Sequence, residues 1–352
     1  MGIHALSITK AVAVLILIAA LTACKNDRGP TITVKEPLLS EKSSHFALDR
    51  LDRLDDVYCA DWVAEQQVIC VPNILSSEST MMIRNLQTGE VSQTNIAAGT
   101  SLQVSPDQKH AFVISHNYGV EMAALGSHDT FPISLKIGDS STSWISTGSQ
   151  GSWADEKTYI LPVINRGFAT VDIDGKVVYS SLDSKQASIL KLVKKGDLVY
   201  SLNVSSQLQM FTKDNSSAPR LIRDHVVSFS LSPDGSKLAF AVQIAPNQES
   251  LYVVNAANGA EETFIAKGRL LRQISWSPDG SKLAFTVLSL DQGMTGLYVM
   301  HAQSGRMTPL SDHTNLERPI VWSPSGGQLM VSEGIPGDRQ TNVFTTIYRL
   351  KS

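Results

Sequence analysis

The sequence predicts an all-β protein, a β-propeller built from four-stranded blades. The prediction rests on a repeated turn motif, on the constant spacing of that motif, and on the apolar strand patterns on either side of it. The motif Ser-Trp-Ser-Pro-Asp-Gly-Ser-Lys-Leu-Ala-Phe occupies residues 275–285 and recurs with one change at 230–240. A third copy lies at 321–331 and a shorter one at 104–112. The prolines at 233, 278 and 324 lie 45 and 46 residues apart, a period typical of propeller blades.

The chemistry of the motif favours a strand, a tight turn and a second strand. Proline presets φ for the second position of a type I turn, Asp can accept hydrogen bonds from its own backbone, and Gly adopts positive φ without strain. After the turn, large and small side chains alternate, which is the period of a β-strand. We expect the blade turns to be built by Pro106, Asp107, Pro233, Asp234, Gly235, Pro278, Asp279, Gly280 and Pro324.

A further pair of strands follows each motif at a fixed offset. Apolar segments at 251–255 and 297–301 lead to Gly259 and Gly305, and an equivalent segment at 81–85 leads to Gly89. A sheet of four such strands cannot bury both faces alone, whereas several sheets stacked around an axis can. A β-sandwich has no reason to repeat one turn at constant spacing. Motif positions near 64, 105, 154, 195, 232, 277 and 323 predict seven blades, or six if the weak unit at 190–223 is not a blade.

The repeated units resemble the WD-repeat-like β-propeller repeats of the TolB family. The resemblance covers most of the chain after about residue 55, with two close copies at 230–240 and 275–285. TolB proteins also carry a separate α/β domain before the propeller, for which this chain has no room. The resemblance implies a protein that binds partner lipoproteins and peptides at the axial mouth of the propeller.

The first residues predict a lipoprotein signal peptide over 1–23. Lys10 precedes an apolar run at 11–21, which has the length of a signal-peptide core. The segment Leu21-Thr22-Ala23-Cys24 resembles a bacterial lipobox, in which Cys24 is lipidated; the alternative is an ordinary Cys near a cleaved signal. Lys25 follows, and by resemblance to Gram-negative sorting it favours the outer membrane. We therefore expect a lipid-anchored protein of the bacterial cell envelope, on the outer membrane and facing the periplasm.

The polar segment 24–55 is interpreted as the lipidated Cys and a linker, and residues 56–352 as the propeller. The last unit, from about 319 to 350, lacks one strand. We expect the N-terminal segment to supply it, from residues 31–34 or 46–48.

Cys59 and Cys70 flank the degenerate turn of the first unit. With the turn centred on Ala64 and Glu65, the two cysteines lie opposite each other across a hairpin, close enough for a disulfide. An exported compartment permits such a bond. The alternative is two buried free thiols, and no second Cys pair or nearby His pair favours zinc.

The chain shows no pattern that commits it to a reaction or a cofactor. The net charge is −3 and the pI is near 6.2, so nucleic acid is not an expected partner. Gly-x-Ser-x-Gly, phosphate-loop and His-Glu-x-x-His motifs are absent from the sequence. Asp172, Asp174 and Gly175 resemble the start of a calcium loop but fit an Asp-Gly hairpin turn better. His110 and His116 are interpreted as solvated side chains rather than metal ligands.

These observations predict a non-catalytic propeller that binds an envelope protein or polymer and touches the membrane through its lipid. No cofactor or metal is expected. The alternative is a polysaccharide lyase or hydrolase with its site in the axial funnel. That alternative requires His, Arg, Tyr or carboxylate side chains to converge there with shifted pKa values.

Overall fold

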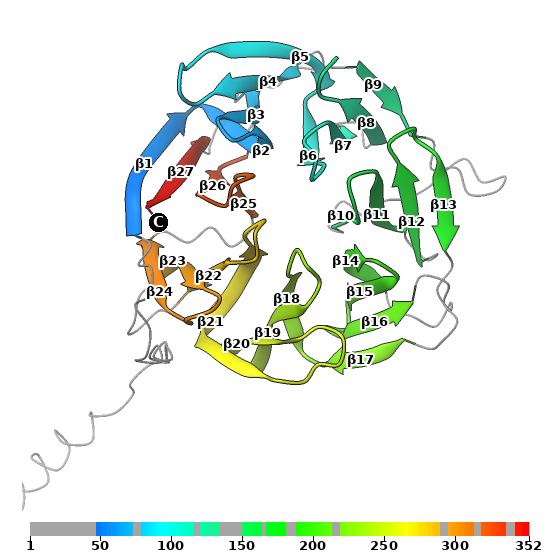
Figure 1. Ribbon diagram of the computed structural model, residues 1–352, viewed down its shortest axis with the longest axis vertical. Coiled ribbons are helices and arrows are strands. Elements are labelled where there is room, and N and C mark those ends of the chain that lie inside the picture. Colours follow the sequence, from blue (N-terminus) through cyan, green and yellow to red (C-terminus); the bar gives the residue numbers. More distant parts are fainter. Residues whose placement is uncertain are drawn as a thin grey trace, which may run out of the picture.

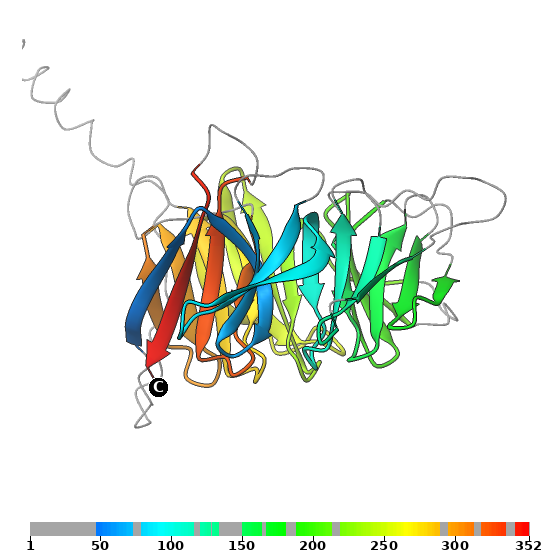
Figure 2. The ribbon, with the colours of Figure 1, turned by 90° about the horizontal axis from the view of Figure 1, so that it is seen from above.

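The computed structural model shows β-sheets arranged as a ring around a central axis (Figure 1). Seen from the side, the ring is a disc whose thickness is set by the length of its strands (Figure 2). In the part of the chain that the structure describes, no helix is long and apolar enough to span a bilayer. The described residues are 47–72, 79–115, 120–127, 129–133, 150–163, 167–180, 188–212, 219–288, 295–312, 318–335 and 342–351.

Four of the sheets are antiparallel meanders of four strands that follow one another in the chain. The strands of the first two are β2 (Val57–Ala64), β3 (Gln67–Pro72), β4 (Thr80–Asn85) and β5 (Val91–Ala97), then β6 (Gly99–Val104), β7 (His110–Ser115), β8 (Val120–Ala124) and β9 (Asp129–Pro132). Those of the next two are β10 (Ser152–Trp153), β11 (Thr158–Val163), β12 (Gly167–Asp172) and β13 (Val177–Ser180), then β14 (Ile189–Lys195), β15 (Leu198–Asn203), β16 (Leu208–Thr212) and β17 (Arg220–Arg223). The weak unit at 190–223 is therefore a four-stranded sheet.

The two closest motif copies share one seven-stranded sheet with the order β18 to β24. Its strands are β18 (Val226–Leu231), β19 (Lys237–Ala245), β20 (Gln248–Asn255), β21 (Thr263–Trp276), β22 (Lys282–Leu288), β23 (Gly296–His301) and β24 (Met307–Ser311). The prediction of seven separate four-stranded blades is wrong in this respect, because the described residues form five such sheets and one sheet of seven strands. The physical reason is that β21 runs for 14 residues without a break. It pairs with β20 through its first half and with β22 through its second half.

The fifth four-stranded sheet closes the ring by joining the two ends of the described chain. Its order is β1 (Ala47–Asp55), β27 (Phe344–Lys351), β26 (Gln328–Glu333) and β25 (Ile320–Trp322). The outer strand that the last unit lacks thus comes from the segment that begins at Ala47, and Figure 1 shows it beside β27. The other candidate segment, 31–34, lies outside the described residues.

The apolar core lies between neighbouring sheets rather than inside any one of them. The described residues form seven clusters of buried side chains. One, for example, joins Ile69 and Met81 of the β2–β5 sheet to Leu102 and Val113 of the β6–β9 sheet. Alternating strand residues supply these contacts from both faces of each sheet, as the period-2 pattern requires. Each sheet is stable only because both neighbours cover it.

The predicted turn chemistry is present at the motif copies. In the copy at 232–237, the N–H of Gly235 donates to the carbonyl of Ser232 at 2.8 Å, which closes the turn around Pro233. The Asp234 carboxylate accepts from the Ser232 hydroxyl at 2.5 Å. Gly235 has φ of 75°, a conformation that other residues adopt only with strain. Asp172 likewise accepts from the backbone N–H groups of Asp174 and Lys176, as a hairpin turn requires.

Candidate functional site

The inner strands of the ring enclose an axial channel made of two connected cavities. The larger, about 910 Å³, is lined by residues from β2, β6, β10, β14, β18, the second half of β21 and β25. The smaller, about 770 Å³, lies where those strands end and the motif turns begin. Asp61, Val104 and Val193 line both cavities, so the second is the mouth of the first. We call the larger cavity the channel and the smaller one the turn-side mouth.

Motif prolines converge on the turn-side mouth. Its lining includes Pro106, Pro233, Pro278 and Pro324, together with Trp residues at the ends of the inner strands. Consecutive turns also pack against one another. A Cβ added to Gly280 would lie 3.7 Å from Cδ of Pro233, and one added to Gly326 would lie 3.6 Å from Cδ of Pro278. At these two junctions, the prolines and glycines of neighbouring motifs therefore form an apolar rim.

Charged side chains of both signs line the same mouth. They come from two neighbouring sheets and comprise Asp155, Glu156, Lys157, Lys194 and Lys195. An apolar floor with a polar edge is the usual anatomy of a surface that binds another protein.

Four inner strands are each tied by a Trp side chain to the inner strand before them in the ring. The indole N–H of Trp276 donates to the carbonyl of Ser230 at 3.3 Å, and that of Trp322 donates to Ser275 at 3.2 Å. Trp153 donates to Gln103 at 3.0 Å and Trp62 to Val321 at 3.2 Å. These bonds fix the width of the channel, because they set the spacing of its walls.

Asp61 reaches from β2 to the neighbouring inner strand. Its carboxylate accepts from the backbone N–H of Trp62 at 2.8 Å and from that of Val104 at 2.7 Å. Burial raises the pKa of Asp61 to about 7, and these two bonds oppose the rise only in part. The Asp61 carboxylate thus links two neighbouring inner strands, β2 and β6, as the Trp indoles link other pairs of inner strands.

Lys191 projects into the channel from β14. Its Nζ donates to the carbonyl of Phe229 on β18 at 2.8 Å and lies 5.2 Å from the centroid of the Phe229 ring. No carboxylate lies within 4.0 Å of this ammonium among the described residues. Burial lowers the pKa of Lys191 to about 8, because a low-dielectric site disfavours the charged form.

Arg272 enters the channel from an irregular part of β21. The pairing with β22 shifts register between Arg272 and Ser275, and Leu270 and Gln273 have φ of 49° and 51°. Nη1 of Arg272 donates to Glu249 at 2.6 Å and to the carbonyl of Leu271 at 2.8 Å. The Glu249 carboxylate also accepts from the Leu271 N–H at 2.6 Å, so this buried acid fixes the guanidinium in place.

Arg318 and Tyr58 meet where the last inner strand adjoins the first. The guanidinium carbon of Arg318 lies 5.2 Å from the centroid of the Tyr58 ring. Burial raises the pKa of Tyr58, and the charge of Arg318 partly opposes the rise. Tyr58, Arg272 and Arg318 each precede a Trp of the inner strands by four residues, so they occupy equivalent positions around the ring.

The residues that the sequence singled out fall in three places. The motif prolines line the turn-side mouth, whereas the carboxylates of Asp107, Asp234 and Asp279 accept hydrogen bonds within their own turns. Cys24 and His116 lie outside the described residues. His110 is half-buried in β7, and its backbone N–H donates to Ser105 at 3.0 Å.

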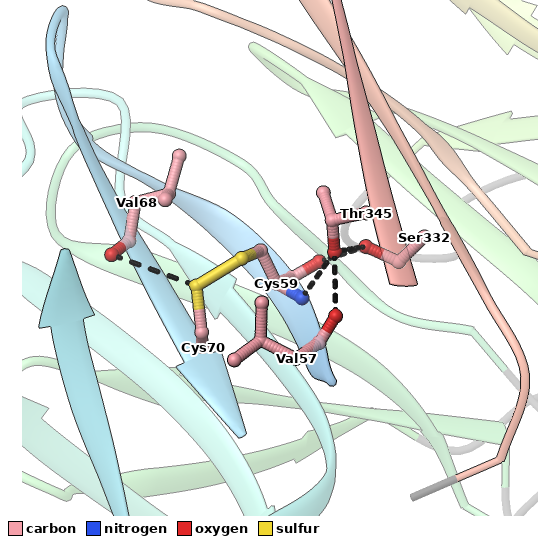
Figure 3. Close-up of a disulfide and its surroundings, with 6 residues drawn as sticks. All are labelled: Val57, Cys59, Val68, Cys70, Ser332 and Thr345. Carbon is pink, nitrogen blue, oxygen red and sulfur yellow. Dashed lines mark hydrogen bonds between the residues drawn. A yellow bond between two sulfur atoms is a disulfide. The ribbon is translucent and has the colours of Figure 1, made fainter. Parts of the chain in front are cut away.

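Cys59 and Cys70 are directly opposed on β2 and β3, and a disulfide of 2.07 Å joins them (Figure 3). Both cysteines are buried, and hydrogen bonds connect Cys59 to the sheet that closes the ring. The Cys59 N–H donates to the hydroxyl of Thr345 at 2.9 Å, and the Cys59 carbonyl accepts from Ser332 at 2.6 Å. The disulfide is therefore a structural element beside the closure and not part of the channel.

Sequence reasoning missed the ionisable side chains of the channel. They are Tyr58, Asp61, Tyr159, Lys191, Arg272 and Arg318. The offset of four residues before a Trp would have found Tyr58, Arg272 and Arg318. Asp61 and Lys191 carry no such signal, because their role depends on a strand of the next sheet. Among the described residues, no three His, Cys, Asp or Glu side chains gather into a group that could hold a metal ion.

No protein-family model and no curated protein sequence matches this chain. Solved structures do match it. An oligogalacturonate lyase from Vibrio parahaemolyticus is similar with a TM-score of 0.65 and 13% identity, over 86% of this chain and 98% of that one. An oligogalacturonate lyase in complex with manganese gives a TM-score of 0.61 and 10% identity, over 91% and 96% of the two chains.

The β-propeller domain of Cps50 (Swd1) from Myceliophteria thermophila is also similar. It gives a TM-score of 0.56 and 12% identity, over 87% of this chain and 99% of that one. At such identities the likeness shows the fold alone: the chain is a β-propeller whose neighbours include both an enzyme and a WD40-type domain.

Proposed function

We propose that this protein is a non-catalytic binding module of the bacterial cell envelope, held at the outer membrane by a lipid on Cys24. A partner protein would bind at the turn-side mouth. The observation that carries the proposal is the set of four motif prolines that line an opening of about 770 Å³. The resemblance of the repeats to the TolB family supports the same reading.

The chemistry of the mouth suits a protein segment. Proline and Trp rings offer rigid apolar surface that loses little conformational entropy on binding. The Lys, Asp and Glu side chains at the edge would fix the orientation of the segment without desolvating fully. Because the turns are held by Ser–Asp bonds and by each other, the surface exists before the partner arrives.

A photo-crosslinking pull-down tests this proposal. A photoreactive amino acid replaces exposed Lys157 at the mouth or, as a matched control, exposed Lys176 at the outer hairpin turn. We expect one envelope protein to be captured at position 157 and not at 176. Equal capture at both positions, or none at either, would remove the mouth from the proposal.

The lipid anchor is tested separately with Cys24→Ala. We expect this variant to leave the membrane fraction while still crosslinking through position 157. A variant that stays membrane-bound would refute the anchor and leave the binding surface standing.

The alternative function, a polysaccharide lyase or hydrolase, gains one specific support. Arg, Lys, Tyr and carboxylate side chains converge in the channel, and the pKa values of Tyr58, Asp61 and Lys191 are shifted. Asp61, however, is committed to two backbone N–H groups. Turnover assays on oligogalacturonate and other envelope or plant polysaccharides would separate the two functions, since the binding module predicts no product.

A further inference from the structure

A set of polar side chains lines the channel apart from the turn-side mouth. Lys191 and Arg272 belong to β14 and β21, the inner strands on either side of β18 in the ring (Figure 1). Lys191 bonds to Phe229 of β18, and the Trp276 end of β21 bonds to Ser230 of β18. Both cations line the same cavity as Ser228 and Ser230.

The guanidinium of Arg272 presents an unused edge. Both of its hydrogen bonds are made by Nη1, while Nε and Nη2 make none among the described residues. Its side chain is 27% exposed, whereas its partner Glu249 is 5% exposed. The Nε–Nη2 edge is the side of a guanidinium that matches two oxygens of one carboxylate. Glu249 thus holds one edge of the arginine and leaves the other available.

The local backbone supports a ligand role for this arginine. Two residues with positive φ, Leu270 and Gln273, lie beside Arg272, although β21 contains only one Gly. Left-handed backbone is strained at a residue with a side chain, and such positions concentrate at binding and catalytic sites. Here the shift in register lies beside Arg272, which lines the channel.

The hydroxyls of Ser228 and Ser230 add neutral donors between the two cations. Neither hydroxyl makes a hydrogen bond within the described part of the chain, and both residues are half-buried. The site therefore offers an ammonium, a guanidinium edge and two hydroxyls.

We propose that this set of side chains binds the carboxylate group of a small molecule within the axial channel. The charge count favours a single negative charge. Glu249 already neutralises Arg272, so Lys191 is the cation of this pair that lacks a carboxylate partner among the described residues. A monocarboxylate would complete the charge balance, whereas a phosphate dianion would exceed it. This site stands independently of the partner proposed for the mouth.

Acetate and inorganic phosphate are suitable probes, each titrated at constant ionic strength into the full-length protein. The NMR signal of the Lys191 side chain, assigned with Lys191→Met, reports occupancy directly. We expect acetate to shift this signal saturably and to raise the pKa of Lys191, and phosphate to bind more weakly. A Lys191 signal that acetate leaves unchanged, or tighter binding of phosphate, would overturn the proposal.

Arg272→Lys tests the guanidinium edge while keeping the charge. We expect acetate affinity to fall about tenfold or more, because a charge-assisted hydrogen bond is lost. Lys176→Met at the outer rim removes one lysine charge, as Lys191→Met does, and should leave affinity unchanged. Circular dichroism confirms that each variant is folded. Equal weakening by Lys176→Met and Arg272→Lys would show a general charge effect and refute the site.

Discussion

Two junctions of this ring solve the same problem by different means. Between the units at 226–262 and 269–311, a single strand, β21, pairs with strands of both units, and its backbone hydrogen bonds carry the connection. At the ring closure, Asp56 alone separates β1 of the last sheet from β2 of the next, but β25, β26 and β27 come from the other end of the described chain. Side-chain hydrogen bonds join these three strands to the β2–β5 sheet.

The closure uses a cluster of hydroxyl groups and one carboxylate. Thr345 bonds to the Cys59 N–H and the Val57 carbonyl, and it lies 2.8 Å from the Ser332 hydroxyl. Glu65, in the first hairpin turn, accepts from Ser323 and Ser325 of the last motif. That motif has Ser325 where other copies have Asp, so a carboxylate from the neighbouring sheet occupies the role of the missing one. The last motif therefore departs from the repeat at residue 325, and this departure lets it bind Glu65 across the closure.

The largest expected effect comes from Thr345→Val, which keeps the shape of a fully buried side chain. It leaves the Cys59 N–H and the Val57 carbonyl without this partner, so we expect a loss of about 2–3 kcal/mol in the free energy of unfolding. Thr286→Val in the seven-stranded sheet is the matched control. It removes one bond, to the carbonyl of Arg272, and should lose about 1 kcal/mol. Urea unfolding of both variants measures the difference, and equal losses would contradict the comparison.

Exchanging the Glu65 carboxylate for one at position 325 of the motif tests the role of Glu65 at the closure. Glu65→Gln should lose about 1–2 kcal/mol of stability, because hydrogen bonds from Ser323, Ser325 and Gln328 weaken. Ser325→Asp alone should also destabilise, since two carboxylates would then compete for the same donors. In the double variant, we expect Asp at 325 to restore part of the loss. A double-mutant cycle from urea unfolding measures the sign of the coupling energy between the two changes. Purely additive losses would show that Asp at 325 cannot take over the role of Glu65.

The motif glycines give a smaller test at each junction. Gly280→Ala and Gly326→Ala place a side chain at φ of 69° and 67°, which should lose about 1 kcal/mol each. Gly326→Ala should lose more, since its Cβ would lie 3.3 Å from Cβ of Ser277. Gln108 occupies the same turn position with φ of 62°, so Gln108→Gly should be neutral or slightly stabilising. Thermal unfolding midpoints report all three, and a strongly destabilised Gln108→Gly would refute the assignment of strain.

Acid unfolding gives the smallest effect and distinguishes the two carboxylates. Burial alone would raise the pKa of Glu65, but bonds from Gln328, Ser325 and Ser323 outweigh it and lower the pKa below 4.5. Bonds from Ser232 and Ser236 lower the pKa of Asp234 from 3.8 to about 2. A lowered carboxyl pKa stabilises the fold above the unfolded-state value and is lost as pH falls through the folded-state value.

Glu65→Gln should therefore flatten the decline in stability just below pH 4.5, and Asp234→Asn should flatten it between about pH 4 and pH 2. Denaturant midpoints measured across this range provide the check. Identical pH profiles for wild type and both variants would mean that neither carboxylate gains stability from its turn.

The repeat could be predicted from sequence because its turns depend on neighbouring residues. Contacts between residues far apart in the chain could not be predicted. Pro278, Asp279 and Gly280 specify their turn by themselves, so the motif could be located without a structure. Glu65 contacts a motif 260 residues away, and no local pattern marks it. The same holds for Lys191, whose acceptor belongs to the next sheet. The predicted count of separate sheets was wrong for a similar reason, since nothing in 263–276 reveals whether the strand breaks between units.

The pairing of β1 with β27 also governs the order in which the fold can form. Ala47 pairs with Lys351, so this sheet joins a strand made before the other sheets to a strand made after them. Every other sheet is assembled from neighbours in the chain, and the Cys59–Cys70 bond spans only 11 residues. Local sheets can therefore form as the chain is made, but closure must await β27 and bear the entropy of the loop between β1 and β27. Until β27 pairs, β1 and β26 each expose an unpaired edge, and these edges are open to mispairing.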